Sequence, residues 1–133
     1  MIGGLIVTHG NLANELLKAA ETIEGNLDGI EAVPLAWSDS VDEAREKIRV
    51  ALGTLEGYDG VIIFTDMFGG TPSNLAISCM SRPKVEVLAG INLPMLVKLA
   101  KVRDSRSLPD AISAAQEAGR KYVTIASRVL AGK

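Results

Sequence analysis

Short apolar runs alternate along this chain with longer segments of helical period, and this alternation restricts the folds open to it. The runs are rich in β-branched residues and span Met1 to Thr8, Ile30 to Leu35, Gly60 to Thr65 and Lys84 to Ala89. Short runs of this kind predict strands, and strands that alternate with helices predict βαβ units around a parallel sheet. The third run has no polar alternation, as expected where helices cover both faces of a sheet.

The segments between these runs carry helix signals. Apolar residues recur at helical spacing over Asn11 to Glu24 and over Ser40 to Leu55. Prolines at first-turn positions predict two further helices, over about Pro72 to Met80 and Leu93 to Val102. A fifth helix is predicted from Leu108 to Gly119, after the start signal Ser-Leu-Pro-Asp.

The segment that follows the fifth helix has two interpretations. Lys121 to Ser127 alternates polar and apolar residues of high β-propensity, which favours a short strand, whereas Ala126 to Leu130 also fits a helix. A strand here must pair at a sheet edge, in its own subunit or in a neighbour's. The predicted fold class is therefore α/β, a doubly wound and mostly parallel sheet with helices on both faces and a C-terminal edge strand.

The composition restricts the classes of protein to consider. A chain of 133 residues that is 47% hydrophobic fits one domain over residues 1–133. Its net charge of −2 and lack of a basic cluster argue against nucleic acid as a partner. The single cysteine, Cys79, permits no intrachain disulfide framework or CxxC metal site and is expected to be buried. We find no leader and no apolar run long enough to span a membrane, so we expect a cytoplasmic protein without membrane insertion.

Two candidate motifs follow the first and third predicted strands. His9 is the only histidine, and Gly10 behind it permits a tight turn. Asp66 follows the third strand and precedes the loop Gly69-Gly70-Thr71-Pro72. Because ligands bind at the carboxyl ends of the strands in an open parallel sheet, the two motifs are expected to meet there.

This combination is typical of a phosphoryl acceptor. A carboxylate that accepts a hydrogen bond from one ring N–H holds a histidine in the tautomer whose other nitrogen is free, so Asp66 is predicted to orient His9. The first N–H groups of a helix, at the positive end of its dipole, bind phosphoryl oxygens. The candidate phosphoryl-binding residues are Gly70, Thr71, Ser73 and Asn74.

Each of these signals also has a purely structural interpretation, and it is their conjunction at neighbouring strand ends that favours a site. Met67 and Phe68 are expected either to fold back onto the core or to contact a partner protein. Trp37, after the second strand, is predicted to be a local packing anchor, and Asn92 a helix cap.

At these residues the chain strongly resembles the mannose-type enzyme IIA of the bacterial phosphoenolpyruvate-dependent phosphotransferase system. The matching segments are Ile6 to Gly10, Asp66 to Asn74 and Ala89 to Leu96. The resemblance implies that His9 is phosphorylated by the carrier HPr and passes the group to an enzyme IIB, with IIC and IID components where a transporter is present. It also implies that Asp66 is the partner of His9, and that Thr71 stands where the family often has serine.

The same resemblance implies a sheet of order 2-1-3-4 and a homodimer that exchanges an antiparallel edge strand, which here would be Lys121 to Ser127. No cofactor is expected, neither metal nor nucleotide, because the donor is already a phosphoprotein. Members that transport sugar often continue into a IIB domain. Because this chain ends at Lys133, its IIB partner is expected to be a separate protein, or the phosphoryl group to serve regulation.

Three other functions fit part of the pattern. A phosphocarrier subunit of a dihydroxyacetone kinase also begins with a strand that ends in histidine, but the loop from Gly69 to Pro72 argues against it. A metal chelatase can place His-Gly at the same point but usually needs a further ligand, and this chain has no second histidine. A binding module whose phosphorylation state informs a regulator is the third.

Overall fold

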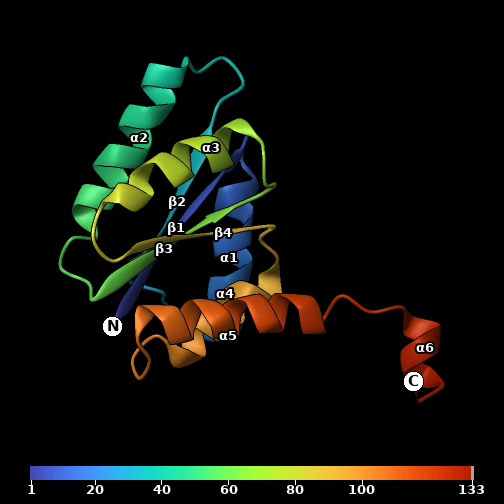
Figure 1. The fold of residues 1–133 in the computed structure, drawn as a ribbon. Coiled ribbons are helices and arrows are strands. Elements are labelled where there is room, and N and C mark those ends of the chain that lie inside the picture. The colour runs from blue at the N-terminus through green and yellow to red at the C-terminus, as the bar shows by residue number, and fades with distance from the viewer. Residues whose placement is uncertain (133) are drawn as a thin grey trace.

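The computed structural model describes residues 1–132, in which four strands form one parallel sheet in the order β2-β1-β3-β4 (Figure 1). The strands are β1 (Ile2–His9), β2 (Ile30–Leu35), β3 (Gly60–Thr65) and β4 (Val85–Ala89). β1 pairs with β2 and β3, and β3 pairs with β4, all in parallel. The four predicted strands and the order implied by the resemblance are confirmed, with bounds that shift by no more than one residue.

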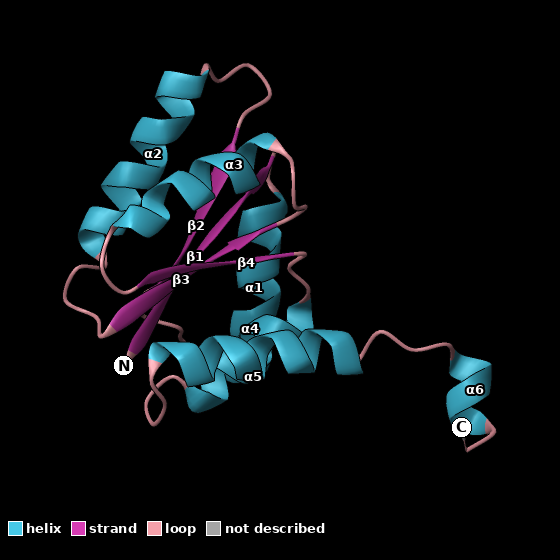
Figure 2. Cartoon of the chain, in the orientation of Figure 1, coloured by secondary structure: helices cyan, strands magenta, loops and turns pink. Residues whose placement is uncertain are grey.

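Helices cover both faces of this sheet (Figures 1 and 2). One face packs against three helices and the other against two. A 3₁₀ turn directly follows the second helix of that pair. On the first face lie α1 (Leu12–Glu24), α4 (Leu93–Val102) and α5 (Leu108–Lys121). On the second lie α2 (Val41–Thr54), α3 (Thr71–Ser78) and the turn η1 (Cys79–Ser81).

The side chains of β1 alternate between two apolar cores. Ile2 and Ile6 pack against the face of α1, α4 and α5, whereas Leu5 and Val7 pack against the face of α2 and α3. All four are buried, so the strand has no polar face, as expected for a central parallel strand. Cys79, expected to be buried, is only half-buried beside the second core.

Three helices begin at residues whose side chains cap them. Ser40, Asn92 and Ser107 each accept a hydrogen bond from the backbone N–H three residues further on, over 3.1, 3.3 and 3.3 Å. Asn92 also donates from Nδ2 to the carbonyl of Gly119 at 3.0 Å, which joins the start of α4 to the end of α5. The prediction that Asn92 is a helix cap is confirmed.

The C-terminal segment differs from the prediction. Lys121 ends α5, residues 123–125 pair with no strand in the described part of the chain, and α6 (Ala126–Leu130) follows. The predicted strand over Lys121 to Ser127 is therefore wrong for the single chain, and the alternative of a helix over Ala126 to Leu130 is confirmed. The physical reason is that a segment of high β-propensity forms a strand only where a neighbouring strand pairs with its backbone N–H and C=O groups. Figure 1 shows α6 standing apart from the body of the molecule.

Candidate functional site

The turn that carries His9 is fixed by hydrogen bonds on both sides. His9 is the last residue of β1, and Gly10 behind it has a φ of +59°, which glycine adopts readily. The Gly10 N–H donates to the carbonyl of Leu35 at 2.8 Å, which ties the turn to the end of β2. On the other side the Ala13 N–H donates to Thr8 Oγ1 at 2.8 Å, so the buried Thr8 anchors the start of α1. The imidazole is thereby held at the carboxyl edge of the sheet.

Asp66 lies directly against the imidazole. Its Oδ2 is 2.7 Å from His9 Nδ1 and also accepts the His9 backbone N–H at 2.9 Å, while its Oδ1 accepts the Met67 N–H at 2.8 Å. The two side chains are 29% and 14% exposed for His9 and Asp66, respectively. The structure thus brings together the two residues that the sequence placed at separate strand ends.

The environment of Asp66 favours its ionised form. Burial opposes ionisation, but the hydrogen bonds from the His9 backbone and ring and from the Met67 N–H outweigh it, so the pKa of the Asp66 carboxyl lies below its ordinary value. A carboxylate can only accept hydrogen bonds, and Nδ1 therefore carries the proton when the imidazole is neutral. The lone pair of the neutral ring is then on Nε2.

The start of α3 approaches this free side of the imidazole. A Cβ built on Gly70, the residue before the helix, would lie 3.2 Å from His9 Cε1 and 3.8 Å from His9 Nε2. Only a residue without a side chain leaves that space open. The sequence-predicted loop and the histidine therefore do meet.

The four predicted phosphoryl-binding residues surround this helix start, but their backbone N–H groups differ in whether they already donate a hydrogen bond. Gly70 donates to Met67 O at 3.3 Å and Asn74 donates to Gly70 O at 2.9 Å. Within residues 1–132 the N–H groups of Thr71 and Ser73 donate to no other group, as expected in a first helical turn. Thr71 is exposed, whereas Ser73 is buried and its Oγ has no partner in that range.

Trp37 lies beside His9, in a place that the sequence did not predict for it. Its indole stacks on the imidazole of His9, with ring centroids 4.9 Å apart and an angle of 20° between the planes. The side chain is 83% exposed, so the prediction of a packing anchor is wrong. The position after β2 and the strand order implied by the resemblance were both available, but neither shows that the two rings stack.

Two further apolar side chains stand at the rim of the site. Met67 is 63% exposed and Phe68 75% exposed, and neither folds back onto the core. The alternative in which they fold back onto the core is therefore wrong, and both side chains are accessible to another molecule.

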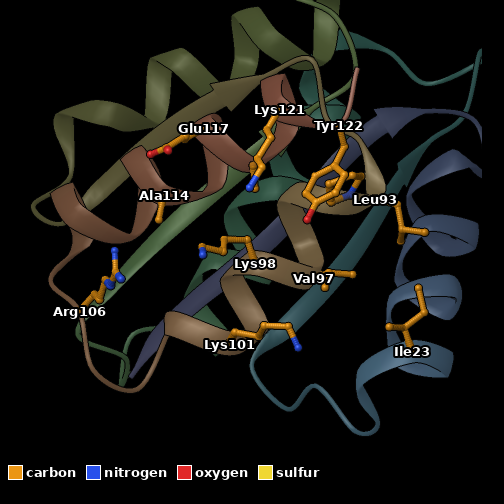
Figure 3. Close-up of a pocket in the computed structure, with 12 residues that line it drawn as sticks. Ile23, Leu93, Val97, Lys98, Lys101, Arg106, Ala114, Glu117, Lys121 and Tyr122 are labelled. Carbon is orange, nitrogen blue, oxygen red and sulfur yellow. The ribbon is translucent and has the colours of Figure 1, made fainter. Parts of the chain in front are cut away.

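A separate groove of about 570 Å³ lies between α4 and α5 (Figure 3). It is lined by Leu93, Val97 and Tyr122 together with Lys98, Lys101 and Lys121, and it includes neither His9 nor Asp66. Among residues 1–132 no three His, Cys, Asp or Glu residues are grouped so that they could hold a metal ion. In the same range no helix has the length and apolar character needed to cross a membrane.

Comparison with known proteins identifies a family for this chain. The model of the EIIA-man family, described as "PTS system fructose IIA component", matches residues 3–116. The mannose-specific EIIAB component of the PTS of Escherichia coli K12 is 33% identical over 121 residues, which make up 90% of this chain and 38% of that protein. The fructose-specific EIIA component of Bacillus subtilis is 30% identical over 114 residues, or 85% of this chain and 78% of that protein.

Solved structures share the fold. A PTS IIA protein associated with the fucose utilization operon of Streptococcus pneumoniae superposes with a TM-score of 0.84 at 28% identity, over 97% of this chain and 96% of that one. The EIIA component of Streptococcus agalactiae superposes with a TM-score of 0.87 at 23% identity, over 96% of this chain and 98% of that one.

Proposed function

This chain belongs to the EIIA-man family of phosphotransferase system components, and from that premise we propose that it is a phosphocarrier. His9 accepts a phosphoryl group from phosphorylated HPr and passes it to an enzyme IIB. The observation that supports this most directly is the 2.7 Å contact between Asp66 Oδ2 and His9 Nδ1, which leaves Nε2 beside the start of α3. We place the exchange in the cytoplasm.

In the proposed transfer the lone pair of His9 Nε2 forms the new P–N bond. The bond between phosphorus and the histidine nitrogen of the donor breaks, and its electron pair returns to that nitrogen. The proton on Nδ1 stays in its hydrogen bond to Asp66, whose negative charge offsets the positive charge that develops on the imidazole. The step needs no further reactant, and transfer to enzyme IIB is its reverse with a different acceptor.

The phosphoryl oxygens are proposed to bind at the start of α3. The N–H groups of Thr71 and Ser73 are the available backbone donors there, and the Thr71 hydroxyl is exposed beside them. The positive end of the helix dipole adds to the attraction. Gly70 and Asn74 contribute mainly by shaping the loop, because their N–H groups already donate within it.

The partner proteins are proposed to dock over Met67 and Phe68. Both HPr and enzyme IIB must bring a phosphorylatable side chain to the same atom of His9, so each covers the rim of the site in turn. Large apolar side chains that are exposed in the free protein are typical of residues at the centre of a protein–protein interface.

A homodimer is the proposed assembly. β4 pairs only with β3 among the described strands, so its other edge is open. Val123 and Ile125 are exposed in a segment with β-propensity, and the equivalent segment of a second copy can add to that edge as an antiparallel strand. Sedimentation velocity should show that the wild-type protein is a dimer. Val123→Pro removes one backbone N–H from the added strand and should convert the dimer to a monomer.

The test of the main proposal is phosphoryl acceptance. Incubation with HPr, its phosphorylating enzyme and phosphoenolpyruvate should add one phosphoryl group, stable in alkali and labile in acid, to the wild-type protein. His9→Ala should accept none while keeping the wild-type circular dichroism spectrum. A His9→Ala variant that is still phosphorylated would overturn the assignment. Later addition of an enzyme IIB should remove the group from the wild-type protein.

A further inference from the structure

The stacked pair of Trp37 and His9 suggests more than a chance surface contact. Resting on the proposed phosphoryl transfer, we propose that Trp37 is a positioning residue, whose indole fixes the plane of the imidazole so that Nε2 faces the start of α3. The ring centroids lie 4.9 Å apart at an angle of 20°, which is within the range of an offset aromatic stack.

One hydrogen bond does not fix an imidazole ring. The torsion that rotates a histidine ring has broad minima, and the bond from Nδ1 to Asp66 still permits the ring to tilt about that contact. A planar group against the ring face resists this tilt. Trp37 supplies that group. The ring is therefore constrained at its Nδ1 edge by Asp66 and on one face by Trp37, and the absence of a side chain at Gly70 leaves Nε2 open.

The turn that carries Trp37 is fixed by hydrogen bonds on both sides of this residue. The Asp39 N–H donates to Ala36 O at 3.0 Å, and Asp39 Oδ2 accepts the Ala36 N–H at 2.9 Å. Lys47 Nζ of α2 lies 2.6 Å from the same Oδ2. Because this turn is closed by its own hydrogen bonds and tied to a helix, less conformational freedom is lost when the indole stacks.

The same turn is linked to the backbone of the histidine. His9 and Leu35 are register partners in the sheet, and the Gly10 N–H donates to Leu35 O at 2.8 Å. A Cβ on Gly10 would lie 3.7 Å from Trp37 Nε1, in ordinary van der Waals contact. The end of β2 is therefore held beside the His9 turn by backbone contacts that do not depend on the indole, and Trp37 follows two residues later.

Trp37 adds little to the core, so its effect on transfer can be separated from stability. With 83% of the side chain exposed, replacement removes almost no buried apolar area. We expect the unfolding temperature of Trp37→Leu and Trp37→Phe to equal that of the wild type within about two degrees. The change should instead appear in the rate at which His9 is phosphorylated.

Two phosphoryl donors separate positioning from docking. Phosphoramidate is a small donor that makes no protein interface, whereas phosphorylated HPr must also dock. Trp37→Leu should lower the maximal rate about three- to tenfold with both donors, whereas Trp37→Phe, which keeps a ring, should stay within about twofold of the wild type. Val50→Ala, an exposed apolar change on α2, should change neither rate.

Several outcomes would overturn the proposal. A loss with HPr alone, or a rise in KM with unchanged kcat, would make Trp37 a docking residue. Equal loss in the leucine and phenylalanine variants would mean that the aromatic ring has no role. If the wild-type protein is phosphorylated by neither donor, the proposed function fails instead. The stack is then still testable, because Trp37 is the only tryptophan and its fluorescence should change in His9→Ala.

Discussion

Asp66→Asn separates the charge of this residue from its shape. The wild-type carboxylate accepts three hydrogen bonds, two from His9 and one from the Met67 N–H, at 2.7 to 2.9 Å. An asparagine amide has one accepting oxygen and one NH₂ group that only donates. If the amide oxygen keeps both bonds from His9, the NH₂ group faces the Met67 N–H, so at least one bond is lost together with the negative charge.

The size of the effect follows from these contacts. A hydrogen bond to a charged group contributes about 1.5 to 3 kcal/mol, and each 1.4 kcal/mol changes a rate about tenfold. Because Asp66 is only 14% exposed, water does not replace the lost interaction fully. We therefore expect Asp66→Asn to accept a phosphoryl group about 10- to 100-fold more slowly than the wild-type protein.

Rapid-quench measurement of phosphohistidine formation at saturating phosphorylated HPr gives this rate directly. Glu117→Gln, which neutralises an exposed carboxylate of α5, is the matched control and should leave the rate unchanged. A rate for Asp66→Asn within threefold of the wild type would refute the role assigned to the charge. It would leave Asp66 as a hydrogen-bonding spacer for the His9 turn.

Three further predictions concern the same fold. Because the folded-state pKa of Asp66 is lowered, its carboxylate stabilises the fold above its ordinary pKa of about 4 and loses that contribution as the pH falls through the lower folded value. In urea titrations the stability difference between wild type and Asp66→Asn should shrink as the pH falls below about 4. Gly70→Ala should slow phosphorylation at least about tenfold with little change in unfolding temperature, because its φ of −80° suits alanine but the new Cβ meets His9 Cε1 at 3.2 Å. Leu99→Ala, at a side chain with no exposed area, should lower the free energy of unfolding by about 2 to 5 kcal/mol in urea.

The sequence predicted the sheet well because its signals are local or follow general rules. The run from Gly60 to Thr65 has the apolar continuity of a central strand, and the caps at Ser40 and Asn92 need only residues three positions apart. His9 and Asp66 could be paired because the carboxyl ends of parallel strands share an edge. Their geometric pairing followed from topology, while their chemical roles remain predictions.

Trp37 and the C-terminal segment could not be predicted in the same way. A tryptophan after a strand usually packs locally, and nothing within a few residues of Trp37 reveals that the imidazole of His9 lies beneath it. The segment from Lys121 to Ser127 has strand propensity, but a strand forms only where it pairs with a neighbour, and within residues 1–132 this segment pairs with no strand. Both cases depend on contacts between segments that are distant in sequence or in separate molecules.

The turn that holds His9 and the exposed rim of the site are made by different kinds of residue, and this difference has a consequence for evolution. The turn at His9 is secured mainly by backbone and buried groups such as Thr8, whereas Met67 and Phe68 are exposed and add little to stability. Substitutions at these rim positions carry a small folding penalty. If partners dock over these residues as proposed, related proteins can diverge in the partners they recognise while the groups around the imidazole stay constant, and several such carriers can coexist in one cell without exchanging phosphoryl groups.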